Sequence, residues 1–398
     1  MGETMARQRI AVLGGCGHVG LPLALTFAAR GCDVDVVDVS AEAVAATNAG
    51  RMRFLEEGAA DLLAAHAGKN LVATTDASVV ARASTIICVV GTPIDEHLNP
   101  QMAKLVRVMD DLKPHLRPGQ LFALRSTVYP GATLRIARWC EENVPGVLVA
   151  FCPERVAQGI AIREIQELPQ IVSGCTPEAL ARARSLFAII ADKLIELEPT
   201  EAELAKLFCN AWRYISFATA NQFYALCMQN GIDYYRVLDA IKLDYPRMKG
   251  LPSAGFAAGP CLFKDTMQLA AYYRNEFSLG QSAMLVNEGL PLVLMQELRK
   301  LDLRGSVVGI LGMAFKAGSD DTRDSLAFKL KKLLALECRD VLCTDEHVTA
   351  PWVLPLEEVL SRSDVLVVGV PHERYRGLSP RQPTLDPWNH LGRGGLMK

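Results

Sequence analysis

The chain has 398 residues, and 42 Lys and Arg against 44 Asp and Glu leave a formal net charge of −2. A charge this close to zero provides no bulk basic field for nucleic acid or for an anionic membrane surface. Half of the residues are apolar and 22% are charged, which is typical of a globular protein and excludes a largely disordered chain. At about 150 residues per domain, the length predicts two or three domains.

Membrane insertion and secretion are not expected. No apolar run approaches the roughly 18 residues that a membrane span needs. The segment MGETMARQRI leads into a strand-like segment without the apolar stretch of a signal peptide. The 11 cysteines are scattered without a C-x-x-C pair, as free thiols in a reducing compartment would be. We therefore expect a soluble, cytoplasmic protein.

From residue 9 to about residue 197, short apolar segments alternate with amphipathic stretches. The strand candidates, in chain order, are RIAVLG, CDVDVVDV, STIICVVG, QLFALRS, VLVAFCP, PQIVSG and DKLIELE. Strands separated by helical segments predict a parallel sheet that is covered on both faces.

From about residue 199 to residue 301 the pattern is almost wholly helical, with apolar residues at intervals of three and four. The Pro- and Gly-rich segment 244–261 interrupts it before the helical pattern resumes at KDTMQLAAYYRN. A second α/β unit begins near residue 303, with segments SVVGILGMAF, LAFKLKKLLAL, DVLCTD and SDVLVVGVP. We expect an α/β protein in which two Rossmann-like parallel-sheet domains, 1–198 and 302–398, are joined by a helical central domain, 199–301.

The segment IAVLGGCGHVGLPLALTFAARGCDVDVVD has the features of a dinucleotide-binding turn. Gly15, Gly17 and Gly20 form G-x-G-x-x-G between a strand and a helix, so a pyrophosphate could lie at the helix N-terminus. Asp38 ends the next strand, where a carboxylate binds a ribose diol and repels a 2′-phosphate, which favours NAD over NADP. The alternative is a simple glycine turn with a surface aspartate.

Two further segments follow strand ends. Gly91 and Thr92, in VVGTPID, lie where open sheets bind ligands, although such a segment is a plain loop as often as a site. Glu154, in CPERVAQG, is a candidate carboxylate for handling water. The alternative for Glu154 is a helix-starting residue after proline.

Cys261 differs in its surroundings from most of the other cysteines, which lie in apolar runs. It follows AAGP and precedes KDT at a predicted helix start, where backbone amides and a lysine can activate a thiol. A buried thiol beside a turn is the alternative. Lys206 and Asn210 are four residues apart and so share one helix face, although an exposed lysine on a solvated face explains the same spacing.

Seven segments occur together in one order: GGCGHVGLPLA, VVGTPID, RSTVYPG, CPERVAQG, EAELAKLFCNAWR, GFAAGPCLFKDT and GMAFKAGSDDTRDS. This combination, which covers nearly the whole chain, resembles the UDP-glucose/GDP-mannose dehydrogenase family of nucleotide-sugar 6-dehydrogenases. The resemblance implies an N-terminal NAD domain, a helical core that forms a homodimer, and a C-terminal domain that binds a UDP-linked sugar.

The resemblance also implies residue roles. The implied catalytic residues are the nucleophile Cys261, its polar neighbours Lys206, Asn210 and Asp265, and Thr127 and Glu154 for positioning and activating water. Those implied to contact NAD are Gly15, Gly17, His18, Val19, Gly20, Asp38, Gly91, Thr92, Ser126, Thr127, Lys264 and Arg323. Those implied to contact the nucleotide-sugar are Glu154, Arg155, Lys206, Asn210, Arg247, Phe256, Gly259, Phe315 and Lys316, with Arg247 reaching across the dimer interface. No metal is expected.

The family chemistry is a four-electron oxidation of a C6 primary alcohol to a carboxylate with two NAD. A cysteine thiolate captures the intermediate aldehyde, and the resulting thioester is hydrolysed. The sequence departs from the family at Ala43, where a basic residue is common, and at Glu57, where proline is common. Pro-Glu-Arg at Arg155 resembles the N-acetylhexosamine branch, whereas the loop GPCLFKDT is closer to UDP-glucose enzymes. UDP-glucose and a UDP-N-acetylhexosamine therefore both remain possible substrates.

Two other functions are considered. A two-electron β-hydroxyacid-type NAD dehydrogenase shares the dinucleotide turn and a Lys-x-x-x-Asn helix, but Cys261 and the second α/β domain argue against it. A non-catalytic nucleotide-binding protein is disfavoured because Cys261, Lys206, Asn210 and Asp265 are all present.

Overall fold

The computed structural model describes residues 7–92, 95 and 101–398, and the chain divides into two compact units, Met1–Phe208 and Cys209–Lys398. Each unit is described by itself below. Residues 93–94 of the predicted VVGTPID segment lie outside the described residues.

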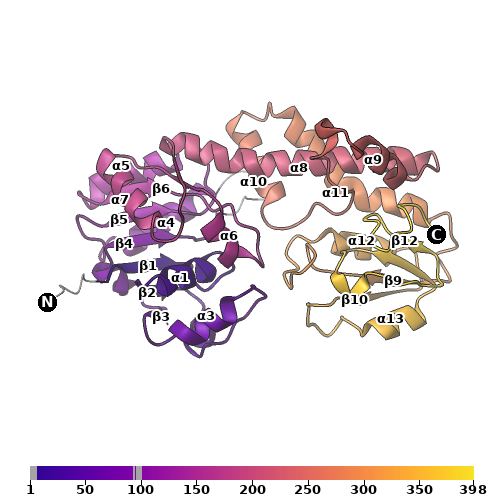
Figure 1. Cartoon of the computed structure of the whole chain (residues 1–398), viewed down its shortest axis with the longest axis horizontal. Helices are drawn as coiled ribbons and strands as arrows, with labels where there is room; N and C mark the ends of the chain where they lie inside the picture. The colour runs from indigo at the N-terminus through magenta and orange to yellow at the C-terminus, as the bar shows by residue number, and fades with distance from the viewer. Residues whose placement is uncertain (1–6, 93–94, 96–100) are drawn as a thin grey trace. The chain divides into compact units, whose positions relative to one another are not determined.

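The first unit contains a parallel sheet of six strands in the order β3-β2-β1-β4-β5-β6 (Figure 1). Its strands are β1 (Arg9–Leu13), β2 (Asp33–Val37), β3 (Leu71–Thr74), β4 (Thr85–Cys88), β5 (Leu121–Leu124) and β6 (Leu148–Phe151). The central strands are short apolar runs that are buried on both faces. On β1, Ile10 and Val12 enter one apolar cluster, and Ala11 and Leu13 enter another, because successive side chains alternate across a sheet.

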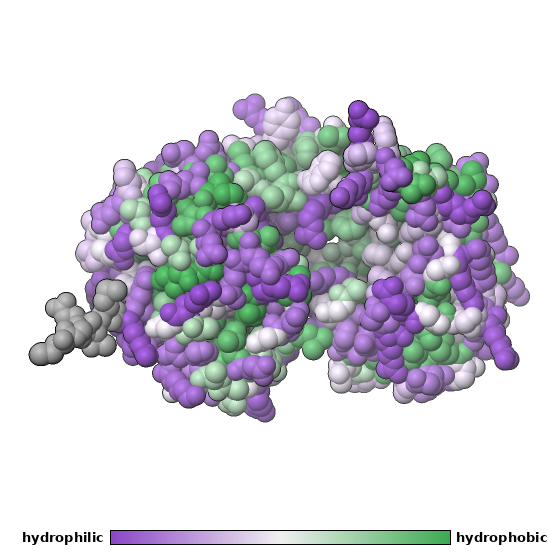
Figure 2. Space-filling model, viewed as in Figure 1, coloured by the Kyte–Doolittle hydropathy of each residue, from purple (hydrophilic) through white to green (hydrophobic). Residues whose placement is uncertain are grey.

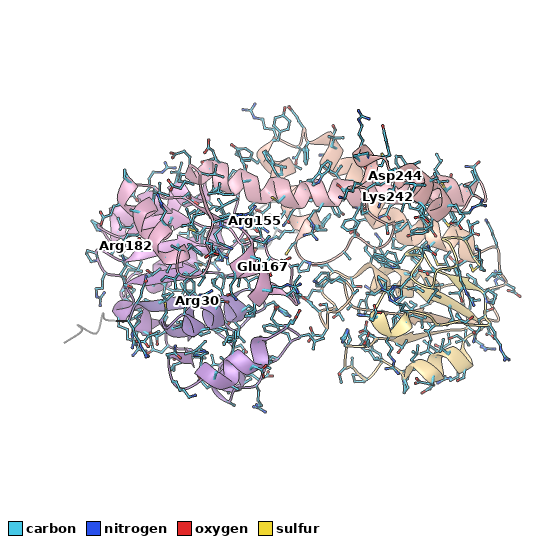
Figure 3. The ribbon with its side chains drawn as sticks, viewed as in Figure 1. Arg30, Arg155, Glu167, Arg182, Lys242 and Asp244 are labelled. Carbon is cyan, nitrogen blue, oxygen red and sulfur yellow. The ribbon has the colours of Figure 1, made fainter. Side chains whose placement is uncertain are left out.

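The helices of this unit are α1 (Gly20–Ala29), α2 (Ala41–Asn48), α3 (Ala59–His66), α4 (Met102–Leu112), α5 (Ala132–Asn143), α6 (Ala161–Glu167) and α7 (Pro177–Phe187), with the 3-10 helix η1 (Ala77–Arg82). Ser40 and Thr176 accept backbone N–H bonds at the starts of α2 and α7, as N-cap residues do. The helices α1 and α6 lie side by side. Arg30, labelled in Figure 3, follows the end of α1, and its Nη2 donates to Gln166 Oε1 of α6 at 3.0 Å.

The long helix α8 (Pro199–Gln229) starts in the first unit and continues into the second. Near its start, the buried carboxylate of Glu203 accepts bonds from the backbone N–H groups of Gly131 at 2.6 Å and Thr133 at 2.8 Å. These are amides at the start of α5, so Glu203 supplies the acceptor that this helix end would otherwise lack.

The second unit contains further helices and a second parallel sheet. The helices are α9 (Tyr234–Lys242), α10 (Leu262–Tyr272), α11 (Ser278–Leu298), α12 (Leu326–Leu334) and α13 (Leu356–Arg362), with the 3-10 helices η2 (Pro246–Met248) and η3 (Glu373–Tyr375). The strands are β9 (Val307–Leu311), β10 (Asp340–Thr344), β11 (Val365–Val368) and β12 (Thr384–Leu385), in the order β10-β9-β11-β12. Every pair in this sheet is parallel.

The predicted fold class is confirmed: two parallel α/β sheets and a helical central region are present. The strand candidates all contain strands, but β7 (Gln170–Val172) and β8 (Leu194–Glu196) pair with each other in a separate two-stranded sheet. The strand predictions missed β3, whose residues Val72 and Thr74 are not fully buried, and the two-residue strand β12. The predicted domain boundaries, at residues 198 and 301, remain predictions. In the part of the chain that the structure describes, no helix is both long and apolar enough to cross a bilayer.

Candidate active site

The glycine turn between β1 and α1 has the shape that a pyrophosphate requires. A Cβ on Gly15 would lie 2.7 Å from Val12 O, and one on Gly20 would lie 2.5 Å from Gly15 Cα, so close backbone packing demands glycine at both positions. A Cβ on Gly17 would lie 3.8 Å from its nearest neighbour, Gly14 O, so packing within the fold does not require glycine there. The open space at Gly17 fits the approach of a ligand to the backbone.

The start of α1 also fits an anion. Val19 occupies the N-cap position and provides no side-chain cap bond. The Leu21 N–H donates to Gly17 O at 3.0 Å and Pro22 has no N–H, so within the first turn of α1 it is the Gly20 N–H that a phosphate oxygen could bind. The neighbouring His18 ring stacks on Phe54 with centroids 4.1 Å apart. Phe54 was not predicted from the sequence, because no local signal connects it with the turn.

Asp38 follows β2 and contacts this turn. Its Oδ2 accepts from the Cys16 N–H at 3.0 Å, and its Oδ1 accepts from the Ser40 N–H at 3.1 Å. The carboxylate is thereby held beside the glycine turn, at the carboxyl end of β2, where a ribose diol would be bound.

The ends of β4 and β5 bring together the remaining predicted cofactor residues of the first unit. Ser126 Oγ donates to Val90 O at 2.6 Å, and Thr92 Oγ1 donates to Thr127 O. The segment containing Gly91 and Thr92 is therefore bound to Ser126 and Thr127. Since β4 lies next to β1 and the strand order reverses between them, these residues border the crevice where doubly wound sheets bind dinucleotides.

Glu154 is buried and fully engaged. Its Oε2 accepts from Arg125 Nε at 2.9 Å and Nη2 at 2.5 Å, and its Oε1 accepts from the N–H groups of Arg155 at 2.7 Å and Val156 at 3.1 Å. Four donors fill the usual lone-pair sites of a carboxylate. In this structure Glu154 holds the loop after β6, and its use as a base requires water to replace one of these donors.

Arg125, which was not singled out in the sequence, is the partner that explains this geometry. Its side chain is fully buried, and it also donates to Gln170 Oε1 at 3.0 Å and stacks at 4.8 Å on Phe187. The guanidinium of Arg155 instead donates to Pro169 O (Figure 3). The only signal for Arg125 was its position in RSTVYPG, directly after β5.

In the second unit, Cys261 is exposed at the N-cap position of α10, and it provides no side-chain cap bond. Most other cysteines are buried: burial raises the pKa of Cys88 to about 11 and that of Cys152 to about 12. Such thiols are poor nucleophiles at neutral pH. Cys209 is also exposed, but it lies within α8 rather than at a helix start.

The polar groups around Cys261 come from three elements. Asp265, in the first turn of α10, accepts from Asn210 Nδ2 of α8 at 2.6 Å and lies 3.3 Å from Lys264 Nζ. The pKa of the Arg323 guanidinium is raised, mainly because it donates hydrogen bonds to Asp321. The charge of Cys261 raises this pKa further, so the thiol and the guanidinium interact electrostatically. The second unit therefore brings together five predicted residues, Cys261, Asn210, Lys264, Asp265 and Arg323.

The loop before Cys261 is tightly packed. Gly259 has φ +101°, and a Cβ there would lie 2.5 Å from Cδ2 of Phe315, so only glycine fits under this ring. Lys316 Nζ lies 6.0 Å from the centroid of Phe315, and Phe256 is buried in the same loop as Gly259. The predicted substrate residues Phe256, Gly259, Phe315 and Lys316 thus belong to two adjoining loops.

Arg247 and Lys206 are the remaining predicted residues of the substrate site. Arg247 is exposed in η2, with its guanidinium 5.6 Å from the centroid of Tyr245. Lys206 is half-buried on α8, four residues before Asn210, and it belongs to the first unit.

Among the described residues, Glu346, His347 and His372 bring three possible metal ligands within 4.8 Å of one another. Both ring nitrogens of His372 already have partners, since Nε2 lies 3.1 Å from Asp345 Oδ2 and Nδ1 lies 3.3 Å from the Gly318 N–H nitrogen. We assign no metal to this group.

Three domains of one family match the chain in order. The UDP-glucose/GDP-mannose dehydrogenase family NAD binding domain matches residues 8–191, its central domain matches 200–289 and its UDP binding domain matches 309–389. The chain belongs to this family. It is an NAD-dependent oxidoreductase that acts on the CH–OH group of a nucleotide sugar.

Similar proteins are found over nearly the full length. A UDP-N-acetyl-D-mannosamine dehydrogenase of Pyrococcus horikoshii is 29% identical, covering 97% of this chain and 93% of the relative. The structure of the UDP-D-ManNAc dehydrogenase of that organism superposes with a TM-score of 0.88, at 28% identity and 96% coverage of both chains. The structure of a UDP-glucose dehydrogenase from Pyrobaculum islandicum superposes with a TM-score of 0.86, at 26% identity, and the match covers 98% of this chain and 96% of that one.

We predict that Asp38→Ala raises the Michaelis constant for NAD about tenfold, because two hydrogen bonds from a ribose diol to a carboxylate are lost. Steady-state kinetics with NAD and NADP would measure this change together with weaker discrimination against NADP. Asp33→Ala, at the opposite end of β2, is the matched control and should leave the NAD constant unchanged. An unchanged constant in Asp38→Ala would remove Asp38 from the cofactor site.

Proposed function

We propose that this protein oxidises the C6 primary alcohol of a UDP-hexose to the uronic acid through a covalent adduct on Cys261. The observation that carries the proposal is an exposed thiol at the start of α10, beside the buried Asn210–Asp265 pair and the guanidinium of Arg323. A helix N-terminus and a nearby guanidinium both favour the thiolate form of a cysteine. The matched UDP binding domain supports a UDP-linked substrate.

The chemistry proceeds in two oxidations with covalent capture between them. When bound, NAD accepts the hydride of each oxidation. The Cys261 thiolate attacks the aldehyde carbon left by the first oxidation, forming a C–S bond, and the carbonyl oxygen takes up a proton to give a thiohemiacetal. Loss of a second hydride and of the hydroxyl proton gives a thioester. Water then attacks the thioester carbon and loses its protons to the general base and to solvent, the C–S bond breaks, and the carboxylate and the thiolate are released.

Asn210 is proposed to donate to the oxygen on which negative charge develops. One N–H of its amide is bound to Asp265 at 2.6 Å, which fixes the amide plane and the direction of the second N–H. Lys206, one turn earlier on α8, is proposed as a second donor. A preorganised donor of this kind contributes about 3 kcal/mol to transition-state stabilisation.

Thr127 and Glu154 are proposed to position and activate the hydrolytic water. The N–H donors on Oε1 of Glu154, from Arg155 and Val156, are backbone groups of its own loop. A small shift of this loop on substrate binding would release one acceptor site for water, while Arg125 stays bound to the other carboxylate oxygen. Glu154 would then act as the general base of thioester hydrolysis.

A UDP-N-acetylhexosamine is the proposed sugar class. Relatives named UDP-N-acetyl-D-mannosamine dehydrogenase cover most of this chain, and Arg155 follows Pro-Glu as in the N-acetylhexosamine branch. UDP-glucose is the second candidate, because a UDP-glucose dehydrogenase structure superposes nearly as well.

The function is tested by incubating the protein with NAD and a panel of UDP-glucose, UDP-N-acetylglucosamine, UDP-N-acetylmannosamine and GDP-mannose. We expect a UDP-N-acetylhexosamine to be oxidised with two NADH formed per sugar, measured by absorbance and by mass spectrometry of the product. One NADH per sugar would instead support the two-electron dehydrogenase. Absence of turnover with every sugar would contradict the proposal.

We predict that Cys261→Ser slows net oxidation at least about a hundredfold, since an alkoxide is much harder to generate than a thiolate. Intact-protein mass spectrometry of the variant after turnover should show an ester-linked sugar. Cys209→Ser, which alters the other exposed cysteine, is the control and should retain the wild-type rate. Wild-type turnover by Cys261→Ser would exclude the covalent route.

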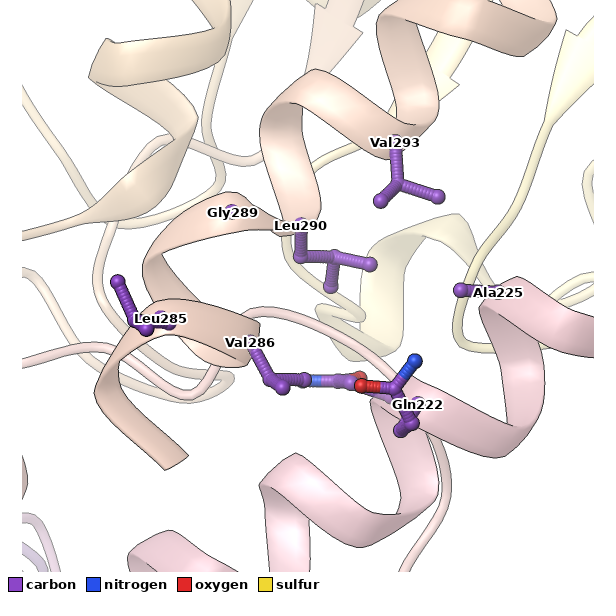
Figure 4. Close-up of a pocket in the computed structure, with 8 residues that line it drawn as sticks. Gln222, Ala225, Leu285, Val286, Gly289, Leu290 and Val293 are labelled. Atoms are coloured by element: carbon purple, nitrogen blue, oxygen red, sulfur yellow. The ribbon is translucent and has the colours of Figure 1, made fainter. Parts of the chain in front are cut away.

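We further propose a homodimer formed through the central helices of the second unit. Trp212, Phe223 and Leu226 on α8 and Leu285 on α11 expose large apolar side chains. A groove between these helices is lined by apolar residues of both, including Ala225, Val286 and Val293 (Figure 4), and apolar surface is seen along α8 in the space-filling view (Figure 2). A second copy could cover such a face in a two-fold arrangement. The 11 cysteines are scattered without a C-x-x-C pair, which agrees with a reducing, cytoplasmic location, and we propose this location as well.

We predict that Trp212→Glu and Leu285→Glu each lower the dimer association constant at least about tenfold, because a charge is placed in an apolar interface. Sedimentation analysis would compare their mass with twice the 43.4 kDa of one chain. Leu336→Glu is the control, since Leu336 is 83% exposed outside these helices. A wild-type protein that sediments as a monomer would contradict the dimer.

A further inference from the structure

We infer that His372, acting through Asp345, is a positioning residue for loop 312–318, which carries Phe315 and Lys316. The inference rests on the proposed function, in which these two residues bind the nucleotide-sugar. Neither His372 nor Asp345 was among the predicted site residues.

Asp345 holds the start of the loop. It directly follows β10, and its Oδ2 accepts from the N–H groups of Met313 at 2.6 Å and Ala314 at 2.9 Å. These are the two residues before Phe315, so the carboxylate fixes the direction in which the chain enters the loop.

His372 holds the other end of the loop and orients Asp345. The strand β11 ends four residues before it, and its Nε2 lies 3.1 Å from Asp345 Oδ2, in the geometry of an N–H donor to a carboxylate. The Gly318 N–H donates to His372 Nδ1 at 3.3 Å. The side chains of His372 and Asp345 have no exposed surface, so water cannot easily replace these bonds.

The arrangement spans three adjacent strands. The loop leaves β9, while Asp345 follows β10 and His372 follows β11, the two neighbours of β9 in the sheet. A buried imidazole therefore ties the carboxyl ends of β10 and β11 to the loop between them. The His390 ring nitrogen Nε2 lies 2.7 Å from the backbone oxygen of His372, which restrains the backbone of His372 as well.

Loop 312–318 in turn contacts the cysteine loop. The ring of Phe315 lies where a Cβ on Gly259 would be, two residues before Cys261, and the Phe315 N–H donates to Asp321 O at 2.9 Å. Movement of the loop would therefore displace both the Phe315–Lys316 pair and the packing against Gly259. The expected defect is in binding of the nucleotide-sugar rather than of NAD, because the residues proposed to hold the pyrophosphate and the adenosine ribose belong to the first unit.

The test compares His372→Ala, His372→Gln and wild type with the sugar that wild type oxidises. His372→Ala should raise the Michaelis constant for the sugar about tenfold through the loss of a buried hydrogen bond to a carboxylate, with kcat and the NAD constant within about twofold of wild type. His372→Gln should bring the Michaelis constant for the sugar back close to the wild-type value, because the glutamine amide nitrogen can occupy the Nε2 position and donate to Asp345. His66→Ala, which removes a part-buried histidine of the first unit bound to Asn70, should leave all three parameters unchanged.

Calorimetric titration with UDP alone provides a readout that does not need turnover. His372→Ala should bind UDP about tenfold more weakly than wild type, and His372→Gln should bind it nearly as well. If wild type oxidises no sugar, the proposed function fails while UDP affinity still reports on the loop. An unchanged UDP affinity in His372→Ala overturns the inference, and so does a loss of sugar binding, NAD binding and kcat in equal proportion, which marks partial unfolding.

Discussion

Buried or half-buried carboxylates that accept backbone N–H groups fix three loops of this protein. Asp38 binds the amides of Cys16 and Ser40, Glu154 binds those of Arg155 and Val156, and Asp345 binds those of Met313 and Ala314. Each carboxylate lies at or just beyond the carboxyl end of a parallel strand, where the chain leaves the sheet and its amides lose their ladder partners. Because an unpaired buried amide is costly, these acceptors limit the conformations that the loops can adopt.

Cys261 differs in exposure from the cysteines in the cores of the sheets. The thiols in the sheet cores are buried, and their burial disfavours the thiolate, whereas Cys261 is exposed at a helix start. Its support comes from side chains rather than from burial: Asn210 on α8 and Asp265 on α10 bind each other, and Phe315 packs on Gly259 just before it. The thiol that we propose as the nucleophile is thus accessible, while neighbouring side chains hold the loop that carries it.

Local patterns were sufficient for much of the fold, and they predicted several residues of the proposed site. The apolar runs predicted β1, β2 and β4 to β11, because buried strands of a parallel sheet need continuous apolar segments. The glycine spacing and Asp38 predicted the dinucleotide turn, since the close approaches at Gly15 and Gly20 leave no room for a Cβ. The strand β3 escaped prediction because it lies at the edge of its sheet, where Val72 is exposed and the apolar signal is weak.

The sequence by itself determined the class of fold and predicted the dinucleotide turn, and it distinguished the surroundings of Cys261 from those of most of the other cysteines. These features depend on neighbours within a few residues, where spacing and residue type carry the physical requirement. Only the tertiary structure decided that Arg125 neutralises Glu154 and that His372 and Asp345 support the loop of Phe315. Partners 27 and 29 residues apart meet only because parallel strands bring their carboxyl ends to one edge of a sheet, and no local pattern records which ends become neighbours.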